Sequence, residues 1–442
     1  MAQSPSPLDR WLGRVVTLRP GETRALLWSF AYFFCLLAGY YVLRPLRDEM
    51  GIAGGVRNLP WLFTATFVVM LAAVPIYGAA VTRLARRQFI PLVYHFFVAN
   101  IALFWLLLIL DIETVTVARV FFVWTSVFVL FVVSVFWSFM ADLYDNEQSK
   151  RLFGFIAAGG SAGALLGPAI TVSLVGSIGP VNLLLAAGLL LELAVLCALR
   201  LEAAAPRPAA PEPRPVTDKP ASEKLGGGWL DGFALLARSR YLASIALWVA
   251  LLSFAATFLY YQQAAIVAES STDPAVRTRI FATIELAVGL LSFATQFFAT
   301  GRLIARFGVG AALALLPVVF VIGFTVIAIA PVLAAVIAFQ VIQRFANFAI
   351  ANPARESLFT VVARDEKYKA KNVIDTVWFR GADAAFGWVF EGLRASGLGH
   401  AAISFIAVPI SALWLLLAVS LGRSRDRQTP VTPVLQTDPK GA

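Results

Sequence analysis

Twelve stretches of about 20 mostly apolar residues follow one another along this chain, and each is long enough to cross the hydrocarbon core of a bilayer as a helix. Hydrophobic residues make up 59% of the 442 residues and charged residues 14%, against about 45–50% and about 25% in soluble domains. A soluble core has no room for that apolar surplus. We therefore predict an all-α polytopic membrane protein with twelve transmembrane helices. The predicted spans are 25–43, 59–81, 90–110, 115–139, 153–175, 181–199, 241–261, 280–300, 310–330, 331–350, 372–393 and 401–421.

Few residues are arranged in a way that suits catalysis or metal binding. The two cysteines, Cys35 and Cys197, lie inside apolar stretches, and histidines, cysteines and carboxylates do not cluster as metal ligands would. The sequence has no nucleophile-elbow or phosphate-loop pattern. We therefore predict that the protein is not an enzyme and needs neither a metal nor a cofactor.

The basic residues indicate how the spans are oriented. A net charge of +10 would suggest nucleic acid as the partner of a soluble protein, but here topology explains it. With the N-terminus inside, the inner segments hold 27 of the 36 Lys and Arg residues and the outer segments seven. The positive-inside rule therefore places both termini in the cytoplasm, and we expect membrane lipids, not nucleic acid, around the protein. Arginine outnumbers lysine by 29 to seven, which indicates a GC-rich bacterial genome and hence the inner membrane of a bacterium.

A stretch rich in proline, alanine and glycine divides the chain in the middle. It has no periodic apolar face, so we predict a cytoplasmic linker between two six-helix bundles. Leu27-Trp28 in the first half matches Leu247-Trp248 in the second, and two further short sequence matches between the halves are also separated by about 220 residues. Two parallel six-helix repeats resemble the major facilitator superfamily. The predicted parts are an amphipathic cytoplasmic arm (1–24), a first bundle (25–201), the linker (202–228), a second bundle (229–422) and a cytoplasmic tail (423–442).

Polar residues on one face of the tenth span are candidates for substrate binding. Gln340, Arg344 and Asn347 follow the spacing i, i+4, i+7, which puts them on one helix face. An ionisable residue inside a membrane is costly, so Arg344 is a functional candidate. Its guanidinium group matches two oxygens of a carboxylate or phosphate at once. The alternative is that Arg344 extends to the lipid headgroups.

Three further charged residues lie within predicted spans. Arg380 and Asp383 are about one turn apart on the eleventh span, close enough to form an ion pair. Arg380 either contacts substrate or only neutralises Asp383. Glu285 on the eighth span has no partner in its own helix, so it either carries a proton or pairs with Arg380 across the bundle. Glu285 and Asp383 are therefore the candidates for proton coupling.

Small residues recur along the fifth span at Gly154, Gly159, Gly160, Gly163 and Gly167. This spacing lets two membrane helices approach closely. We therefore expect the fifth span to pack tightly against a neighbouring helix.

Three segments carry charged residues in a specific order: YYVLRPLRDEMG (40–51), FWSFMADLYDNEQSKRLFGFIAAGGSAGALLGP (136–168) and PARESLFTVVARDEKYKAKNVIDTVWFR (353–380). Together they resemble the nucleotide transporter family, the non-mitochondrial ATP/ADP translocases. This resemblance implies a major-facilitator-like exchanger in which basic residues bind the substrate phosphates. The family's basic position after the first helix corresponds to Arg47, and its lysine cluster before the eleventh helix corresponds to Lys367, Lys369 and Lys371. Alternatively, the three lysines serve orientation alone.

Arg44 and Arg47 flank Pro45, which we expect to end the first span and to turn both side chains toward the transport pathway. In the alternative interpretation they hold the outer end of the span at the headgroups and pair with Asp48 and Glu49.

Two positions depart from the family that the sequence resembles. Where the translocases carry acidic residues in the fourth and seventh spans, this chain has Thr125 and Tyr260. The resemblance therefore supports the family more strongly than strict ATP/ADP exchange. We predict a monomeric secondary active transporter that works by alternating access and exchanges a nucleotide or another small anionic phosphorylated metabolite. The alternatives are a proton-coupled facilitator of a different solute and a non-transporting membrane module that binds a partner.

Overall fold

The computed structural model describes residues 16–19, 21–83, 86–204, 230–298 and 300–428. Most of the predicted arm, residues 205–228 of the predicted linker and residues 429–442 of the predicted tail lie outside this part of the chain. The described residues form helices joined by short connections, and no strand occurs among them.

The helices of the first half are α2 (Thr23–Ala53), the short η1 (Val56–Asn58), α3 (Leu59–Arg83), α4 (Arg86–Ile109), α5 (Thr114–Leu143) and α6 (Asn146–Ala204). Those of the second half are α7 (Leu230–Arg238), α8 (Arg240–Ser270), α9 (Pro274–Phe298), α10 (Thr300–Ile329), α11 (Leu333–Ala346), η2 (Asn347–Ala351), α12 (Asn352–Leu358), η3 (Phe359–Val361), α13 (Arg364–Asn372), η4 (Val373–Trp378), α14 (Phe379–Ala395) and α15 (His400–Gln428).

These helices account for the twelve predicted spans. Ten helices of the described chain are long and apolar enough to cross a membrane. One of them, α6, contains two predicted spans, because Gly179 has a φ of 78° and turns the chain between them; glycine adopts this conformation without steric cost. The eleventh predicted span falls on η4 and α14. Spans nine and ten separate between Ile329 and Leu333, around the Ala330-Pro331 junction.

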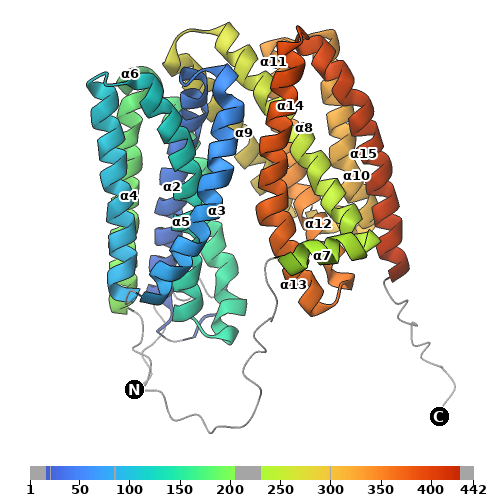
Figure 1. Cartoon of the computed structure of the whole chain (residues 1–442). Coiled ribbons are helices and arrows are strands. Elements are labelled where there is room, and N and C mark those ends of the chain that lie inside the picture. The colour runs from blue at the N-terminus through green and yellow to red at the C-terminus, as the bar shows by residue number, and fades with distance from the viewer. Residues whose placement is uncertain (1–15, 20, 84–85, 205–229, 299, 429–442) are drawn as a thin grey trace, which may run out of the picture.

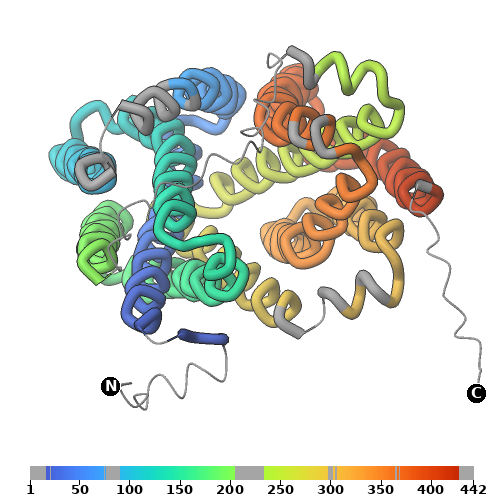
Figure 2. Tube along the Cα trace, turned by 90° about the horizontal axis from the view of Figure 1, so that it is seen from below, coloured from blue at the N-terminus to red at the C-terminus, as the bar shows by residue number. Residues whose placement is uncertain are grey.

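The helices form two bundles that stand side by side, α2 to α6 in one and α7 to α15 in the other (Figures 1 and 2). Each bundle has an apolar core, with Tyr32 and Phe136 fully buried in the first and Trp248 and Trp414 in the second. The predicted all-α, major-facilitator-like fold of two six-helix repeats is therefore confirmed. We call the end at which α2 begins and α15 ends the lower end, as drawn in Figure 1, and the opposite end the upper end.

The glycines of the fifth span hold α6 directly against α2. A Cβ atom on Gly167 would lie 2.5 Å from the carbonyl oxygen of Ala38, and one on Gly163 would overlap the carbonyl oxygen of Phe34. The two backbones touch because no side chain separates them, which confirms the predicted close approach. Gly154, nearer the start of α6, has no atom within 4 Å of the corresponding position.

This contrast gives a matched pair of substitutions. Gly163→Ala forces α2 and α6 apart, and we expect it to lower the stability of the protein by about 1–3 kcal/mol. Gly154→Ala adds the same methyl group to the same helix in open space, so its stability should equal or exceed that of the wild type. Thermal unfolding in detergent measures both. Equal melting temperatures for the two variants would contradict the close contact.

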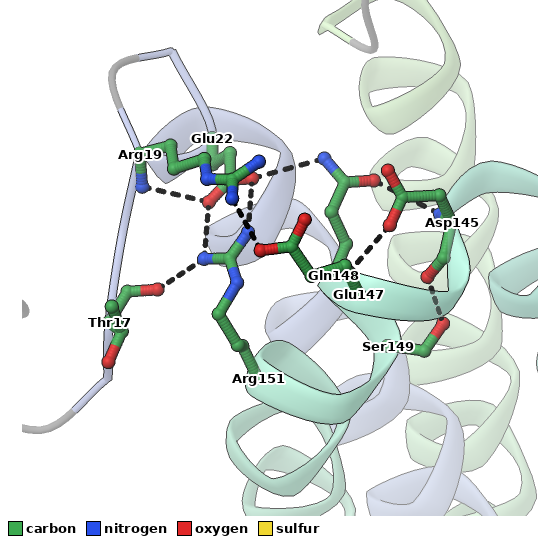
Figure 3. A network of polar contacts seen from close by, with 8 residues as sticks. All are labelled: Thr17, Arg19, Glu22, Asp145, Glu147, Gln148, Ser149 and Arg151. Atoms are coloured by element: carbon green, nitrogen blue, oxygen red, sulfur yellow. Dashed lines mark hydrogen bonds and ion pairs between the residues drawn. The ribbon is translucent and has the colours of Figure 1, made fainter.

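A polar network fastens the start of α2 to the start of α6 at the lower end (Figure 3). Arg151 donates to both oxygens of Glu22, at 2.9 and 3.1 Å, and Gln148 donates to Glu22 at 3.1 Å. Arg19 pairs with Glu147 and also donates its backbone N–H to Glu22 at 2.9 Å. Burial would raise the pKa of Glu22, but the hydrogen bonds from Arg151, Arg19 and Gln148 together hold it below its ordinary value of 4.5.

The lowered pKa of Glu22 sets the sign of a pH effect. A carboxylate whose pKa is lower in the folded state stabilises that state above its unfolded pKa, and the contribution disappears as the pH falls through the folded-state value. We therefore expect Glu22→Gln to lower the melting temperature at pH 7. The difference from the wild type should shrink below about pH 4.5. A difference that stays constant with pH would show that the ionised carboxylate contributes nothing.

Candidate functional site

Two adjoining cavities lie between the bundles. One has a volume of about 250 Å³ and the other of about 330 Å³, and Glu285 and Arg344 line both. Residues of α2, α8, α9, α11 and α14 line the smaller cavity, so both halves of the chain contribute to it. Its charged lining residues are Arg44, Arg47, Asp48, Glu285, Arg344, Arg380 and Asp383.

Arg44 and Arg47 reach this cavity from an unbroken helix. The expectation that Pro45 ends the first span is wrong, because α2 continues through Pro45 to Ala53. Membrane helices tolerate an internal proline where neighbouring groups compensate the lost backbone hydrogen bond. Arg44 and Arg47 lie three residues apart, on one face of α2. Both side chains are mostly buried, at 23% and 20% exposure, and both line the cavity rather than the outer surface.

Glu285 is held between two arginines that come from different bundles. Arg344 of α11 forms a two-pronged ion pair with its carboxylate, with Nη2 2.7 Å from Oε2, and Nε of Arg44 of α2 lies 3.1 Å from Oε1. The alternative in which Glu285 pairs with Arg380 is therefore wrong, since its partners are Arg44 and Arg344. The Glu285 side chain is only 2% exposed, so its charge depends on these two partners.

A second cluster joins α2 to α8. Arg47 pairs with Asp48 at 3.1 Å, and the Tyr260 hydroxyl donates to the same carboxylate oxygen at 3.0 Å. The guanidinium carbon of Arg47 lies 3.9 Å from the ring centre of Phe122, a cation–π contact. Nε of Arg47 is buried without a hydrogen-bond partner in the described chain. Arg47 therefore retains a donor for a bound anion.

All three predicted polar residues of the tenth span line the smaller cavity. Gln340, Arg344 and Asn347 all contact it, and Oδ1 of Asn347 is buried without a hydrogen-bond partner in the described part of the chain. Gln340 donates to Gln263 of α8 at 2.5 Å and accepts from Gln343 at 2.8 Å. Gln263 and Gln343 were not identified from the sequence, although Gln343 continues the same helix face. At Asn347 the helix widens into the π-turn η2, a feature often found at functional sites.

Arg380 and Asp383 form the expected ion pair, with Nη1 3.6 Å from Oδ2. Asp383 also accepts hydrogen bonds from Ser253 at 2.5 Å and Thr257 at 3.5 Å. These two hydroxyls of α8 were not identified from the sequence. Arg380 is 42% exposed, so its guanidinium group is accessible from the cavity that it lines.

The three predicted lysines occupy a different place. Lys367, Lys369 and Lys371 belong to α13 at the lower end, and Lys371 pairs with Glu356. Among the described residues that line the two cavities, none is a lysine. Their role in substrate binding stays a prediction.

Polar and aromatic contacts close the upper end between the bundles. Arg277 of α9 forms a two-pronged ion pair with Glu49 of α2, at 2.6 and 2.7 Å. Trp388 of α14 donates to Thr64 of α3 at 3.0 Å. The larger cavity extends the other way, toward the lower end, where Gln296 and other residues near the ends of their helices line it. Among the residues that the structure describes, no group of three or more His, Cys, Asp or Glu could hold a metal ion.

Two six-helix bundles around a central polar cavity have the architecture of the major facilitator transporters, and comparison with solved structures confirms this fold. The chain is similar to a bacterial homologue of the human lysosomal transporter Spinster, inward-facing and unoccupied (TM-score 0.57, 15% identity, 93% of this chain and 98% of that chain). It is also similar to the nucleoside transporter NupG (0.56, 15%, 92% and 100%). A third similar structure is that of the POT family transporter PepTSo (0.60, 13%, 92% and 99%). No protein-family model matches the sequence, and no curated protein does.

The buried position of Glu285 predicts a strong effect of neutralising it. Glu285→Gln leaves Arg44 and Arg344 facing each other without a counter-charge, which should destabilise the protein by about 3–5 kcal/mol. The double variant Glu285→Gln/Arg44→Gln removes one of the two unpaired cations and should recover part of this loss.

Glu192→Gln is the matched control, because it neutralises a half-exposed glutamate of α6 with a side-chain exposure of 42%. Thermal unfolding in detergent compares the four proteins. If Glu285→Gln and Glu192→Gln melt at the same temperature, the ion pairs of Glu285 do not support the fold.

Proposed function

We propose that the protein is a secondary transporter that works by alternating access and carries a small anion. The observation that carries this proposal is that four arginines from both bundles line one buried cavity: Arg44, Arg47, Arg344 and Arg380. They stand against three carboxylates, so the cavity has an excess of positive charge when all seven groups are ionised. A guanidinium group binds two oxygens of a carboxylate or phosphate in one plane.

Glu285 would act as an internal competitor of the substrate. Its carboxylate binds one arginine from each bundle, as a substrate phosphate or carboxylate would. An incoming anion that displaces Glu285 would keep Arg44 and Arg344 paired, and the released carboxylate would then require a proton or another cation.

The proposed substrate class is a phosphorylated metabolite, in the first place a nucleotide, exchanged for another of its kind. Support comes from the three segments that resemble the nucleotide transporter family and from the aromatic side chains in the cavity wall. Phe63, Tyr260, Phe281 and Phe379 line the same cavity as the arginines. They offer ring faces on which a planar base could pack.

Alternating access would move the two bundles, 25–201 and 229–422, against each other around this site, with residues 202–228 as the tether. We place the monomeric protein in a bacterial inner membrane with both termini in the cytoplasm, on the strength of the Lys and Arg distribution. The upper end would then face outward, and the structure would be the inward-facing state. Opening to the outside requires separation of Glu49 from Arg277 and of Thr64 from Trp388.

Transport by Arg344→Lys tests the proposed site. In proteoliposomes loaded with ADP or another phosphorylated metabolite, the wild type should take up labelled external substrate. Lysine keeps the charge but loses the planar fork, so we expect the exchange rate to fall by about tenfold or more. Arg302→Lys makes the same change at an exposed position of α10 and should leave the rate unchanged. Equal rates for the two variants, at equal protein content, would remove Arg344 from the site.

The same vesicles distinguish the alternatives. Asp383, bound by Ser253 and Thr257 as well as Arg380, supports proton coupling as the second candidate, because two of its partners are uncharged. In that case a pH gradient drives accumulation into vesicles without internal substrate, and Asp383→Asn abolishes it. Uptake that requires internal substrate and ignores the pH gradient supports exchange. No uptake of any anion under either condition supports a non-transporting module.

A further inference from the structure

A large apolar groove runs along the outer surface of the first bundle. Its volume is about 910 Å³, and it shares no lining residue with the two cavities between the bundles. Its floor is α5, and its walls are α3 and α4. Leu92 and Phe96 on its rim are each 58% exposed, and Val120 is 53% exposed. The groove therefore opens on the surface that faces the bilayer.

One arginine interrupts this apolar lining. Among the described residues that line the groove, only Arg119 is charged. It lies five residues after the start of α5 at Thr114, which is about 7.5 Å along the helix from the upper end. Nε of Arg119 donates to the carbonyl oxygen of Gly54 at 2.8 Å, which fixes the position of the guanidinium group. No carboxylate of the described chain forms an ion pair with it.

The length of the groove matches one leaflet of the bilayer. Its floor runs from Arg119 to Phe131 on α5, a distance of about 18 Å at 1.5 Å per residue. Half of the hydrocarbon core measures about 15 Å. A chain that begins at the depth of Arg119 therefore ends near the middle of the membrane, where the groove also ends.

We infer that this groove binds one anionic phospholipid of the leaflet at the upper end, with an acyl chain along α5 and the phosphate at Arg119. Val120, Val123 and Val127 offer the acyl chain a surface without polar groups, and the guanidinium group offers the phosphate a charge-assisted hydrogen bond. A second copy of the protein would need its own anionic group at Arg119, whereas a phospholipid brings one.

The bound lipid would lie against α3, the helix of the first bundle that packs against α14 of the second bundle. α3 forms one wall of the groove, and its Trp61 packs against Trp388 of α14, with ring centres 4.8 Å apart. Phe67 of α3 lies next to Gly381 of α14. A filled groove therefore keeps α3 pressed against α14 and favours the closed upper end.

Native mass spectrometry tests the site. The purified protein is equilibrated with mixed micelles that contain equal amounts of phosphatidylglycerol, which is anionic, and phosphatidylcholine, which is zwitterionic. We expect the wild type to retain one phosphatidylglycerol in preference to phosphatidylcholine. Both lipids carry a phosphate, but only phosphatidylcholine adds a choline cation, which Arg119 repels. Arg119→Gln should therefore lower the preference by about tenfold. Arg119→Lys, which keeps the charge, should retain most of the preference.

The second part of the experiment fills the groove with a bulky side chain. Val123→Trp places a large side chain on its floor and should abolish retention of both lipids. Leu189→Trp is the matched control, because Leu189 is 63% exposed on α6 and lies outside the groove; it should retain lipid as the wild type does. The inference is wrong if the wild type holds the two lipids in the ratio of the mixture, if Arg119→Gln keeps the wild-type preference, or if Val123→Trp, folded as judged by its melting curve, retains lipid like Leu189→Trp.

Discussion

A charge inside a membrane protein is costly unless partners compensate it, and this protein places seven charged side chains around one cavity. The compensation crosses between the bundles, because Glu285 of the second bundle binds Arg44 of the first. Asp48 of the first bundle likewise accepts a hydrogen bond from Tyr260 of the second. The first bundle contributes two arginines and one carboxylate to this cavity, so its excess positive charge is compensated where α2 faces the second bundle. This pairing links the bundles through α2 and places the candidate binding groups at their junction.

Features that depend on local sequence could be predicted. The length of each apolar stretch predicts a span, and the glycine spacing predicts that α6 approaches a neighbouring helix closely, because both depend on residues a few positions apart. The sequence did not predict that this neighbour is α2. Pro45 was the exception. A proline directly after the first apolar stretch was expected to end the helix, but α2 runs past it to Ala53. A membrane helix continues through a proline where neighbouring helices compensate the lost hydrogen bond, and the local sequence does not record those neighbours.

Within the site, only the arrangement of residues on the same helix could be predicted from the sequence. The face with Gln340, Arg344 and Asn347 and the pair of Arg380 with Asp383 follow from helical spacing, and both lie at the cavity. The partners of Glu285 could not be predicted, because they depend on how α2, α9 and α11 are rotated toward one another. Ser253, Thr257 and Gln263 were missed for a related reason. Uncharged polar residues are inexpensive within a span, so they give little signal until a charged group is found beside them.

The continuity of α2 past Pro45 has a mechanical consequence. Arg44, which pairs with Glu285, and Glu49, which pairs with Arg277, belong to the same unbroken helix, α2. They are about 7.5 Å apart along its axis, with no loop between them to absorb a displacement. The glycines of α6 hold the preceding part of α2, from Phe30 to Tyr41, in close contact. A tilt or rotation of α2 imposed at Arg44 would therefore also move Glu49, which would couple the proposed binding cavity to the contacts at the upper end.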